Sequence, residues 1–316
     1  MKTLKQIGEF GLIERIAKQL TTDKTVIRGI GDDAAVISDS GDSYLLFTTD
    51  MLVEGVHFTR REASFYQIGR KSLAVNISDI AAMGGIPTYA VVSCGLPAAL
   101  PLSAADEMIR GISTLAKEFG VNIVGGDTVR SPVIVINIAL LGKVKKNELV
   151  LRSGAKVNDL IFVSGTLGNT RRLKQYNFIP RLKEARYLVK QYKPSSMIDL
   201  SDGLASDLRR ISEQSRVGAV LFEELLPLAP GATARGALYD GEDFELLFTL
   251  PLERVRALYA KRALPDFCTC VGKIVTRKEG LTLIDKKARQ ITLTLKGRPS
   301  SFLLRRGLTP KGFTHF

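Results

Sequence analysis

The order of strand-like and helix-like segments is the feature that most restricts the folds open to this chain. Short runs rich in β-branched and aromatic residues predict strands, and they recur at 44–50, 89–97, 121–127, 133–144, 160–168, 196–202, 244–250 and 268–275. Segments 64–84 and 104–120 repeat apolar residues every three or four positions, which predicts helices. Because strands and helices do not alternate one to one, the pattern favours an α+β fold over a doubly wound parallel sheet.

Length and composition indicate a folded protein with two domains. The chain has 316 residues and is 45% hydrophobic, which is enough to fill substantial cores. A charged and polar stretch near residue 150 precedes a new apolar run, so we place a boundary there, between domains 1–148 and 149–316. No apolar run approaches the roughly 20 residues that span a bilayer. We therefore expect no membrane segment and a cytoplasmic location.

The net charge of +13 points to an anionic partner, such as nucleic acid, a membrane surface or a small polyanion. Eight basic residues and one acidic residue fall between Arg171 and Lys193. Such a run is either a solvated face or a binding surface. Because the chain has no zinc-finger spacing and no aromatic-rich RNA-binding pattern, nucleic acid is the minor hypothesis. Three cysteines and two histidines favour neither a disulfide framework nor a transition-metal site, so any metal should be a hard cation held by oxygen.

Aspartates recur at the ends of apolar runs, each beside small residues: Asp32, Asp33, Asp50, Asp79, Asp127, Asp199 and Asp202. Each one alone is explained equally well as a helix cap or a turn residue. If they converged on one rim, they would repel one another unless cations neutralised them. Together with the hydroxyls of Thr48, Thr49 and Ser201 they form an oxygen-only set, which suits Mg²⁺. The set therefore predicts a nucleoside triphosphate bound through several magnesium ions.

Known nucleotide motifs are missing from the sequence. There is no G-x-x-x-x-G-K-[ST] segment and no protein-kinase set of motifs, and GIGDD lacks the third glycine of a dinucleotide fingerprint. If ATP binds, metal ions must do much of the phosphate binding. The scarcity of histidine favours a phosphate group as the acceptor, because a phosphate monoester is largely a dianion at pH 7 and attacks without a general base.

Eight segments that follow one another along nearly the whole chain resemble thiamine-monophosphate kinases: GIGDDAAV, TTDMLVEGVHF, KSLAVNISDIAAMGG, VGGDTVRS, RSGAKVNDLIFVSGTLG, MIDLSDGLASDL, GEDFELLFT and KGFTHF. The resemblance implies transfer of the γ-phosphoryl group of ATP to thiamine monophosphate. It also implies a two-domain aminoimidazole ribonucleotide synthetase-like fold, in which the N-terminal sheet pairs across a homodimer and the C-terminal domain is α/β sandwich-like.

The same resemblance implies a role for particular residues. The implied magnesium ligands are Asp33, Thr48, Thr49, Asp50, Asp79, Asp127, Asp199 and Asp202, of which Asp50, Asp79, Asp127 and Asp199 are the expected catalytic residues. The implied ATP contacts are Gly126, Asp127, Arg152 and Ser201, and the implied thiamine-phosphate contacts are His57, Glu242 and Phe313. Simpler roles stay open, namely a surface charge for Arg152, a structural histidine at His57 and a core anchor at Phe313.

The second domain departs from the family pattern at four places, one of which is a family H-x-R-P-x-P-R element reduced here to YNFIPRL, with Pro180 and Arg181 retained. Asn169 follows GTLG where the family usually has Asp, NTRRLKQYNF replaces a longer helix of small residues, and Asp240 precedes Gly241 where the family has two glycines. The magnesium set is intact. Three alternatives therefore remain: another acceptor at the same ATP site, a non-catalytic protein that binds nucleotide or thiamine phosphates, and nucleic-acid binding through 171–193. In the turn at 199–207 we expect Asp202 to cap the next helix and Asp207 to face solvent or a neighbouring turn.

Overall fold

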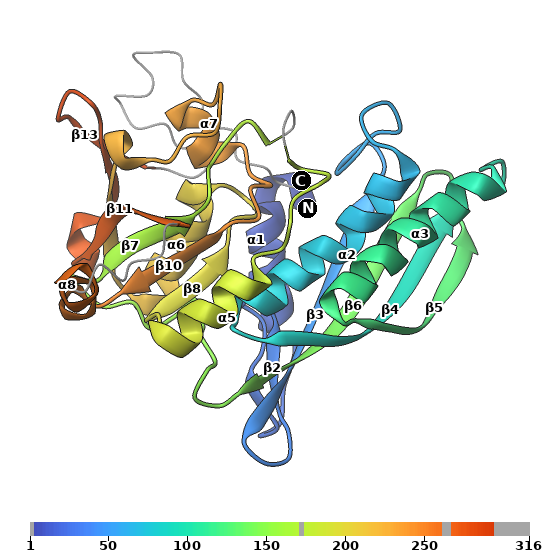
Figure 1. Ribbon diagram of the computed structural model, residues 1–316, viewed down its shortest axis with the longest axis horizontal. Coiled ribbons are helices and arrows are strands. Elements are labelled where there is room, and N and C mark those ends of the chain that lie inside the picture. The colour runs from blue at the N-terminus through green and yellow to red at the C-terminus, as the bar shows by residue number, and fades with distance from the viewer. Residues whose placement is uncertain (1–2, 171–173, 261–266, 294–316) are drawn as a thin grey trace. The chain divides into compact units, whose positions relative to one another are not determined.

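The computed structural model describes residues 3–170, 174–260 and 267–293, and the chain divides into two compact units (Figure 1). Of the described residues, those up to Leu149 together with Gln175–Leu182 form unit 1, and those from Val150 to Lys174 and from Lys183 onward form unit 2. The expected functional domains, 1–148 and 149–316, stay a prediction. Within the described ranges, no helix is both long enough and apolar enough to cross a membrane.

Unit 1 is built on a six-stranded sheet in the order β1-β2-β3-β6-β4-β5. The strands are β1 (Val26–Arg28), β2 (Ala35–Ser38), β3 (Ser43–Val53), β4 (Ile86–Leu96), β5 (Asn122–Arg130) and β6 (Val135–Lys145). The helices are α1 (Leu4–Ala17), α2 (Phe65–Ala82) and α3 (Leu102–Phe119). Neighbouring strands run antiparallel except β4 and β5, which are parallel.

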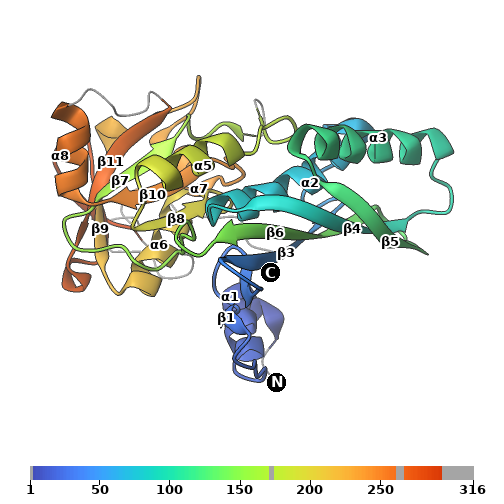
Figure 2. The same cartoon turned by 60° about the horizontal axis from the view of Figure 1, so that its bottom comes forward.

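The two faces of this sheet differ in what covers them. Helices α2 and α3 lie on one face (Figure 2), where alternate strand residues such as Leu46 and Ile138 are completely buried. The opposite face presents exposed apolar side chains, which are Phe47, Met51, Tyr89 and Val91. A side chain on β3 therefore meets α2 or the open face according to its position in the strand.

Unit 2 is built on a seven-stranded sheet in the order β13-β12-β9-β11-β7-β10-β8. The strands are β7 (Leu160–Ser164), β8 (Ser196–Asp199), β9 (Gly218–Phe222), β10 (Leu246–Leu250), β11 (Cys268–Val275), β12 (Leu281–Ile284) and β13 (Gln290–Thr292). The helices are α5 (Leu182–Gln191), α6 (Leu204–Ser215), α7 (Ala234–Tyr239) and α8 (Leu252–Ala260), with short 3₁₀ turns at Glu223–Leu225 and Arg277–Glu279. Only β9 and β12 pair in parallel among these described strands.

The central strands of unit 2 are buried on both faces. Ile161 and Val163 of β7 belong to an apolar core that also contains Leu204 and Leu208 of α6. Phe162, which alternates with them, stacks on Phe248 of β10 with ring centroids 5.5 Å apart. Burial on both sides explains why these strands read as continuous apolar runs in the sequence.

The α+β prediction is confirmed, and each of the eight expected strands overlaps a strand of the structure. The sequence analysis missed β1, β2, β9, β12 and β13, which are three to five residues long. Such short segments carry too few residues for a pattern to emerge from the flanking loops.

Candidate functional site: an acidic cluster and its neighbours

Asp33, Thr48 and Asp79 form an acidic cluster in unit 1. The Thr48 hydroxyl donates to Oδ2 of Asp79 at 2.6 Å and also lies 3.2 Å from the carbonyl oxygen of Asp33. A carboxylate oxygen of Asp33 lies within 4.8 Å of one from Asp79. Two carboxylates this close in a largely buried place repel each other unless a cation or a proton intervenes. The donors are all oxygen, so the cluster fits Mg²⁺ better than a transition metal.

Strand β3 and helix α2 together position this cluster. Asp79 and Asn76 are three residues apart and therefore share a face of α2. The backbone N–H of Asp50 donates to Oδ1 of Asn76 at 3.0 Å, which attaches β3 to the helix one turn before Asp79. Asp50 and Thr48 both point to the helix-covered face because they are two residues apart on the strand. Sequence reasoning gave Asn76 no role, although it lies within a motif that identified Asp79.

Thr49 and Asp127 lie on the open face of the same sheet. The Thr49 hydroxyl donates to Oδ1 of Asn137 on β6 at 3.1 Å. Across the sheet, Asn137 pairs with Ser93 on β4, and Ser93 in turn pairs with Asp127 on β5. Asp127 is exposed and accepts a hydrogen bond from the backbone N–H of Thr128. Unit 1 therefore brings Asp33, Thr48 and Asp79 together and leaves Thr49 and Asp127 on the other face.

Gly126 has a structural requirement of its own. A Cβ at this position would fall 1.8 Å from the carbonyl oxygen of Val92, whereas a Cβ at Gly125 would find its nearest neighbour at 3.9 Å. Side chains larger than hydrogen are therefore excluded where β5 pairs with β4. Close strand pairing explains this glycine whether or not a phosphate approaches it.

His57 lies in the turn after β3, and its ring orientation is fixed by the backbone. The N–H of Val53 donates to Nδ1 at 3.0 Å, so Nδ1 is an acceptor and a neutral imidazole carries its proton on Nε2. The carbonyl oxygen of His57 accepts from Nζ of Lys71 at 3.0 Å. Lys71 is completely buried, with its ammonium 5.2 Å from the centre of the Tyr176 ring. Sequence reasoning missed this lysine, which lies in the apolar α2 pattern.

In unit 2, Asp199 is the buried last residue of β8, and Asp202 lies in the turn before α6. Asp202 forms an ion pair with Arg210, and its backbone N–H donates to Oδ2 of Asp207 at 3.0 Å. Gly203, not Asp202, occupies the N-cap position of α6. Asp207 is completely buried, so the expectation that it faces solvent is wrong and the alternative of a neighbouring turn holds. Burial raises the pKa of Asp207 well above its usual value.

The remaining expected site residues lie in loops of unit 2. Arg152 is half-buried in the segment before β7, and its carbonyl oxygen accepts from the Ser215 hydroxyl at 3.4 Å. Glu242 has a left-handed backbone (φ 59°), and its N–H donates to the carbonyl oxygen of Ser201 at 2.8 Å. One expected ATP contact and one expected substrate contact are thus joined through their backbones. Phe313 lies outside the described residues.

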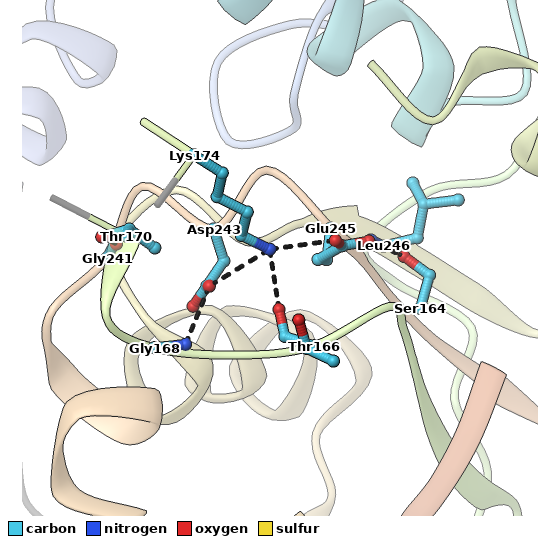
Figure 3. A network of polar contacts seen from close by, with 9 residues as sticks. All are labelled: Ser164, Thr166, Gly168, Thr170, Lys174, Gly241, Asp243, Glu245 and Leu246. Carbon is cyan, nitrogen blue, oxygen red and sulfur yellow. Dashed lines mark hydrogen bonds and ion pairs between the residues drawn. The ribbon is translucent and has the colours of Figure 1, made fainter. Parts of the chain in front are cut away.

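Lys174 belongs to the basic run 171–193, which the sequence analysis interpreted as either a solvated face or a binding surface. The structure instead pairs its ammonium with Glu245 at 3.0 Å and with Asp243 at 3.5 Å (Figure 3). Burial raises the pKa of Asp243 to about 7, against the opposing effect of Lys174. Lys174 therefore lies against acidic partners with 21% of its side chain exposed, whereas Lys183, Lys190 and Lys193 are exposed.

Comparison with known proteins first shows which class of fold the chain has. A family model for the N-terminal domain of AIR synthase related proteins matches residues 31–144, the part of the chain that contains the acidic cluster. A HypE–HypF complex has a chain that is 20% identical to this one with a TM-score of 0.69, covering 91% of this chain and 99% of its own, and it shares the fold alone. The protein is therefore AIR synthase-related in fold.

Relatives that match over the whole chain define the family. A thiamine-monophosphate kinase of Bacillus subtilis is 34% identical, covering 98% of this chain and 100% of its own length, and one of Escherichia coli is 34% identical over 92% and 97%. A structure described as AaThiL complexed with AMPPCP and TMP is 29% identical with a TM-score of 0.82, covering 100% of this chain and 99% of its own. The chain belongs to the thiamine-monophosphate kinase family.

Proposed function

We propose that this protein transfers the γ-phosphoryl group of ATP to thiamine monophosphate, which yields thiamine diphosphate and ADP. The observation that carries the proposal is the acidic cluster, in which carboxylate and hydroxyl oxygens of Asp33, Thr48 and Asp79 converge. Family membership supplies the substrates, because relatives matched over nearly their whole length are thiamine-monophosphate kinases. A cytoplasmic location belongs to the same proposal.

Magnesium is the metal that this donor set favours. We assign Asp33, Thr48 and Asp79 as ligands from the cluster, with Asp50 beside it on β3. Asp199 and Asp202 are further proposed ligands on the strength of the family resemblance, as are Thr49 and Asp127, which lie on the other face of the sheet and would hold a separate ion. When bound, Mg²⁺ would neutralise charge on the phosphate oxygens and align ATP for in-line transfer.

The acceptor phosphate supplies its own nucleophile, which fits the scarcity of histidine in the sequence. A phosphate monoester is mostly a dianion at neutral pH, so no residue needs to remove a proton from it. His57 suits binding better than proton abstraction, because its Nδ1 already accepts from Val53 and a neutral ring offers Nε2–H as a donor. Positioning and charge neutralisation then supply most of the rate.

The other assignments are part of the proposal. We place Gly126, Asp127, Arg152 and Ser201 on ATP, and His57, Glu242 and Phe313 on thiamine monophosphate. Asp50, Asp79, Asp127 and Asp199 are the proposed catalytic residues. The hydrogen bond between the Glu242 N–H and the Ser201 carbonyl oxygen supports the assignment of these two residues to adjoining ligands.

We also propose a homodimer formed through the open face of the unit 1 sheet. Phe47, Met51, Tyr89 and Val91 each expose at least two-fifths of their surface on this face. Large apolar side chains exposed together on one face usually mark an interaction surface. Pairing two copies through the same patch satisfies the symmetry of a dimer.

An acceptor panel tests the proposed activity. The protein is incubated with ATP, Mg²⁺ and, in turn, thiamine monophosphate, thiamine and an unrelated sugar phosphate, and ADP release is measured. We expect ADP with thiamine monophosphate at a rate far above the other two acceptors. Faster ADP release with the sugar phosphate would favour another acceptor at the same site. Tight binding of thiamine monophosphate with no ADP over hours would favour a non-catalytic binding protein.

A further inference from the structure

Lys174 supplies the positive charge in a polar network that joins two loops of unit 2 (Figure 3). Its ammonium donates to the carbonyl oxygen of Thr166 at 2.7 Å and to Oε1 of Glu245 at 3.0 Å, and lies 3.5 Å from Oδ1 of Asp243. Asp243 is 1% exposed and Glu245 is 3% exposed. A buried carboxylate is costly without a counter-charge, so Lys174 stabilises the charged form of both acids.

Three further hydrogen bonds connect the same two loops. The N–H of Gly168 donates to Oδ1 of Asp243 at 2.9 Å, and the Thr170 hydroxyl donates to the carbonyl oxygen of Gly241 at 3.0 Å. The Ser164 hydroxyl donates to Oε2 of Glu245 at 2.6 Å. Described residues of segment 164–174 therefore hydrogen-bond to Gly241, Asp243 and Glu245, which are alternate residues of loop 241–245.

The two residues between them, Glu242 and Phe244, hydrogen-bond instead to the turn at 200–201. The N–H groups of Glu242 and Phe244 donate to the carbonyl oxygens of Ser201 and Leu200, each at 2.8 Å. Both residues have left-handed backbones, with φ of 59° and 48°. Such conformations in residues other than glycine persist only where the surroundings impose them. The contacts from segment 164–174 are thus the restraint on one side of a strained loop, and Ser201 and Leu200 are the restraint on the other.

We propose that Lys174 is a positioning residue for the thiamine-phosphate site, because its ion pairs with Asp243 and Glu245 hold Glu242 in place beside Ser201. This inference rests on the proposed function, in which Glu242 contacts thiamine monophosphate. It also gives a role to Thr170 and Lys174, which lie where the chain departs from the family pattern. Lys174 touches neither substrate in this account and acts through loop 241–245.

Hydrogen exchange tests the positioning role without reference to activity. The variants are Lys174→Met, which removes the charge, and Thr170→Val, which removes only the hydroxyl that binds Gly241. Lys190→Met is the matched control, because Lys190 is an exposed lysine of α5. We expect the amides of Glu242 and Phe244 to exchange about tenfold faster or more in Lys174→Met and measurably faster in Thr170→Val, and at the normal rate in the control. If Lys174→Met fails to fold, Thr170→Val alone decides the outcome.

Kinetics then link the loop to the substrate. In Lys174→Met the KM for thiamine monophosphate should rise on the order of tenfold while the KM for ATP changes much less, because misplaced binding groups weaken only the ligand they contact. Unchanged exchange of both amides in both variants would overturn the proposal, and so would faster exchange spread evenly over unit 2. An equal rise in both KM values would also overturn it. If the unaltered protein forms no thiamine diphosphate, the proposed function fails, while the exchange result still decides the role of Lys174 in the loop.

Discussion

At the scale of single residues, the acidic cluster offers the most direct test of the proposed metal site. Asp79 accepts the Thr48 hydroxyl at 2.6 Å and lies beside Asp33, so its charge is an essential part of the donor set. Asp79→Asn keeps the shape and a carbonyl oxygen that accepts from Thr48, but it removes that charge. The substitution therefore separates metal binding from packing.

We expect Asp79→Asn to lower kcat at least about 100-fold, the scale of losing one preorganised electrostatic contact. Thermal unfolding should be little changed, because the variant keeps the Thr48 hydrogen bond and relieves carboxylate repulsion. Asp106→Asn, an exposed acid on α3, is the control and should retain activity. Normal turnover by Asp79→Asn with Mg²⁺ would show that the cluster is not the metal site.

Asp243 gives a second prediction for a single residue. Its pKa is about 7 in the folded protein against an ordinary 3.8, chiefly because of burial, and its Oδ2 has no hydrogen-bond partner among the described residues. Between these two values the folded protein binds more protons than the unfolded chain. The free energy of unfolding should therefore fall as pH rises through this window and level off above about pH 7.

Urea unfolding across that pH range measures the effect, and Asp243→Asn should flatten the profile between 3.8 and about 7. Asp106→Asn serves again as the control and should leave the profile unchanged. A profile for Asp243→Asn that kept the full slope would assign the pH dependence to other groups.

At the scale of elements, the pairing of β5 with β4 depends on one glycine. Gly126→Ala would place a Cβ 1.8 Å from the Val92 carbonyl oxygen, whereas Gly125→Ala would add a methyl in ordinary contact with Val91. We expect Gly126→Ala to lower the free energy of unfolding by about 1–3 kcal/mol or more, the usual cost of overpacking. Gly125→Ala should change it by less than about 1 kcal/mol. Equal effects on denaturant unfolding would contradict this packing.

The sequence predicted the long helices and strands, but it could not predict side-chain contacts between residues far apart in the chain. Long patterns succeeded, as in α2, where apolar periodicity and a Ser64 cap define an 18-residue helix. Individual side chains depended on long-range contacts that no local pattern records. The sequence showed Lys174 only as part of a basic run, whereas its partners Asp243 and Glu245 are about 70 residues away along the chain. Asp33 and Asp79 were recognisable by motif, but only the folded structure shows that their carboxylate oxygens lie within 4.8 Å of each other.

At the scale of the whole molecule, the open face of the unit 1 sheet predicts the oligomeric state. Met51→Asp places a charge within the apolar patch, and burying that charge against a second copy is unfavourable. We expect the unaltered protein to sediment as a dimer and Met51→Asp to raise the dimer Kd at least about tenfold. Ile109→Asp, on an exposed part of α3, should remain dimeric. A monomeric parent protein, or equal sedimentation of both variants, would contradict the proposed interface.

The central claim is that this chain carries out magnesium-dependent phosphoryl transfer to a phosphate acceptor, and ³¹P NMR of the reaction mixture tests it most directly. With ATP, thiamine monophosphate and Mg²⁺, the account predicts that the monophosphate signal is replaced by the two signals of thiamine diphosphate as ADP forms. Omitting Mg²⁺ or adding a chelator should stop both changes. Formation of ADP with inorganic phosphate and no thiamine diphosphate, or an undiminished rate of transfer in the presence of chelator, would contradict the account.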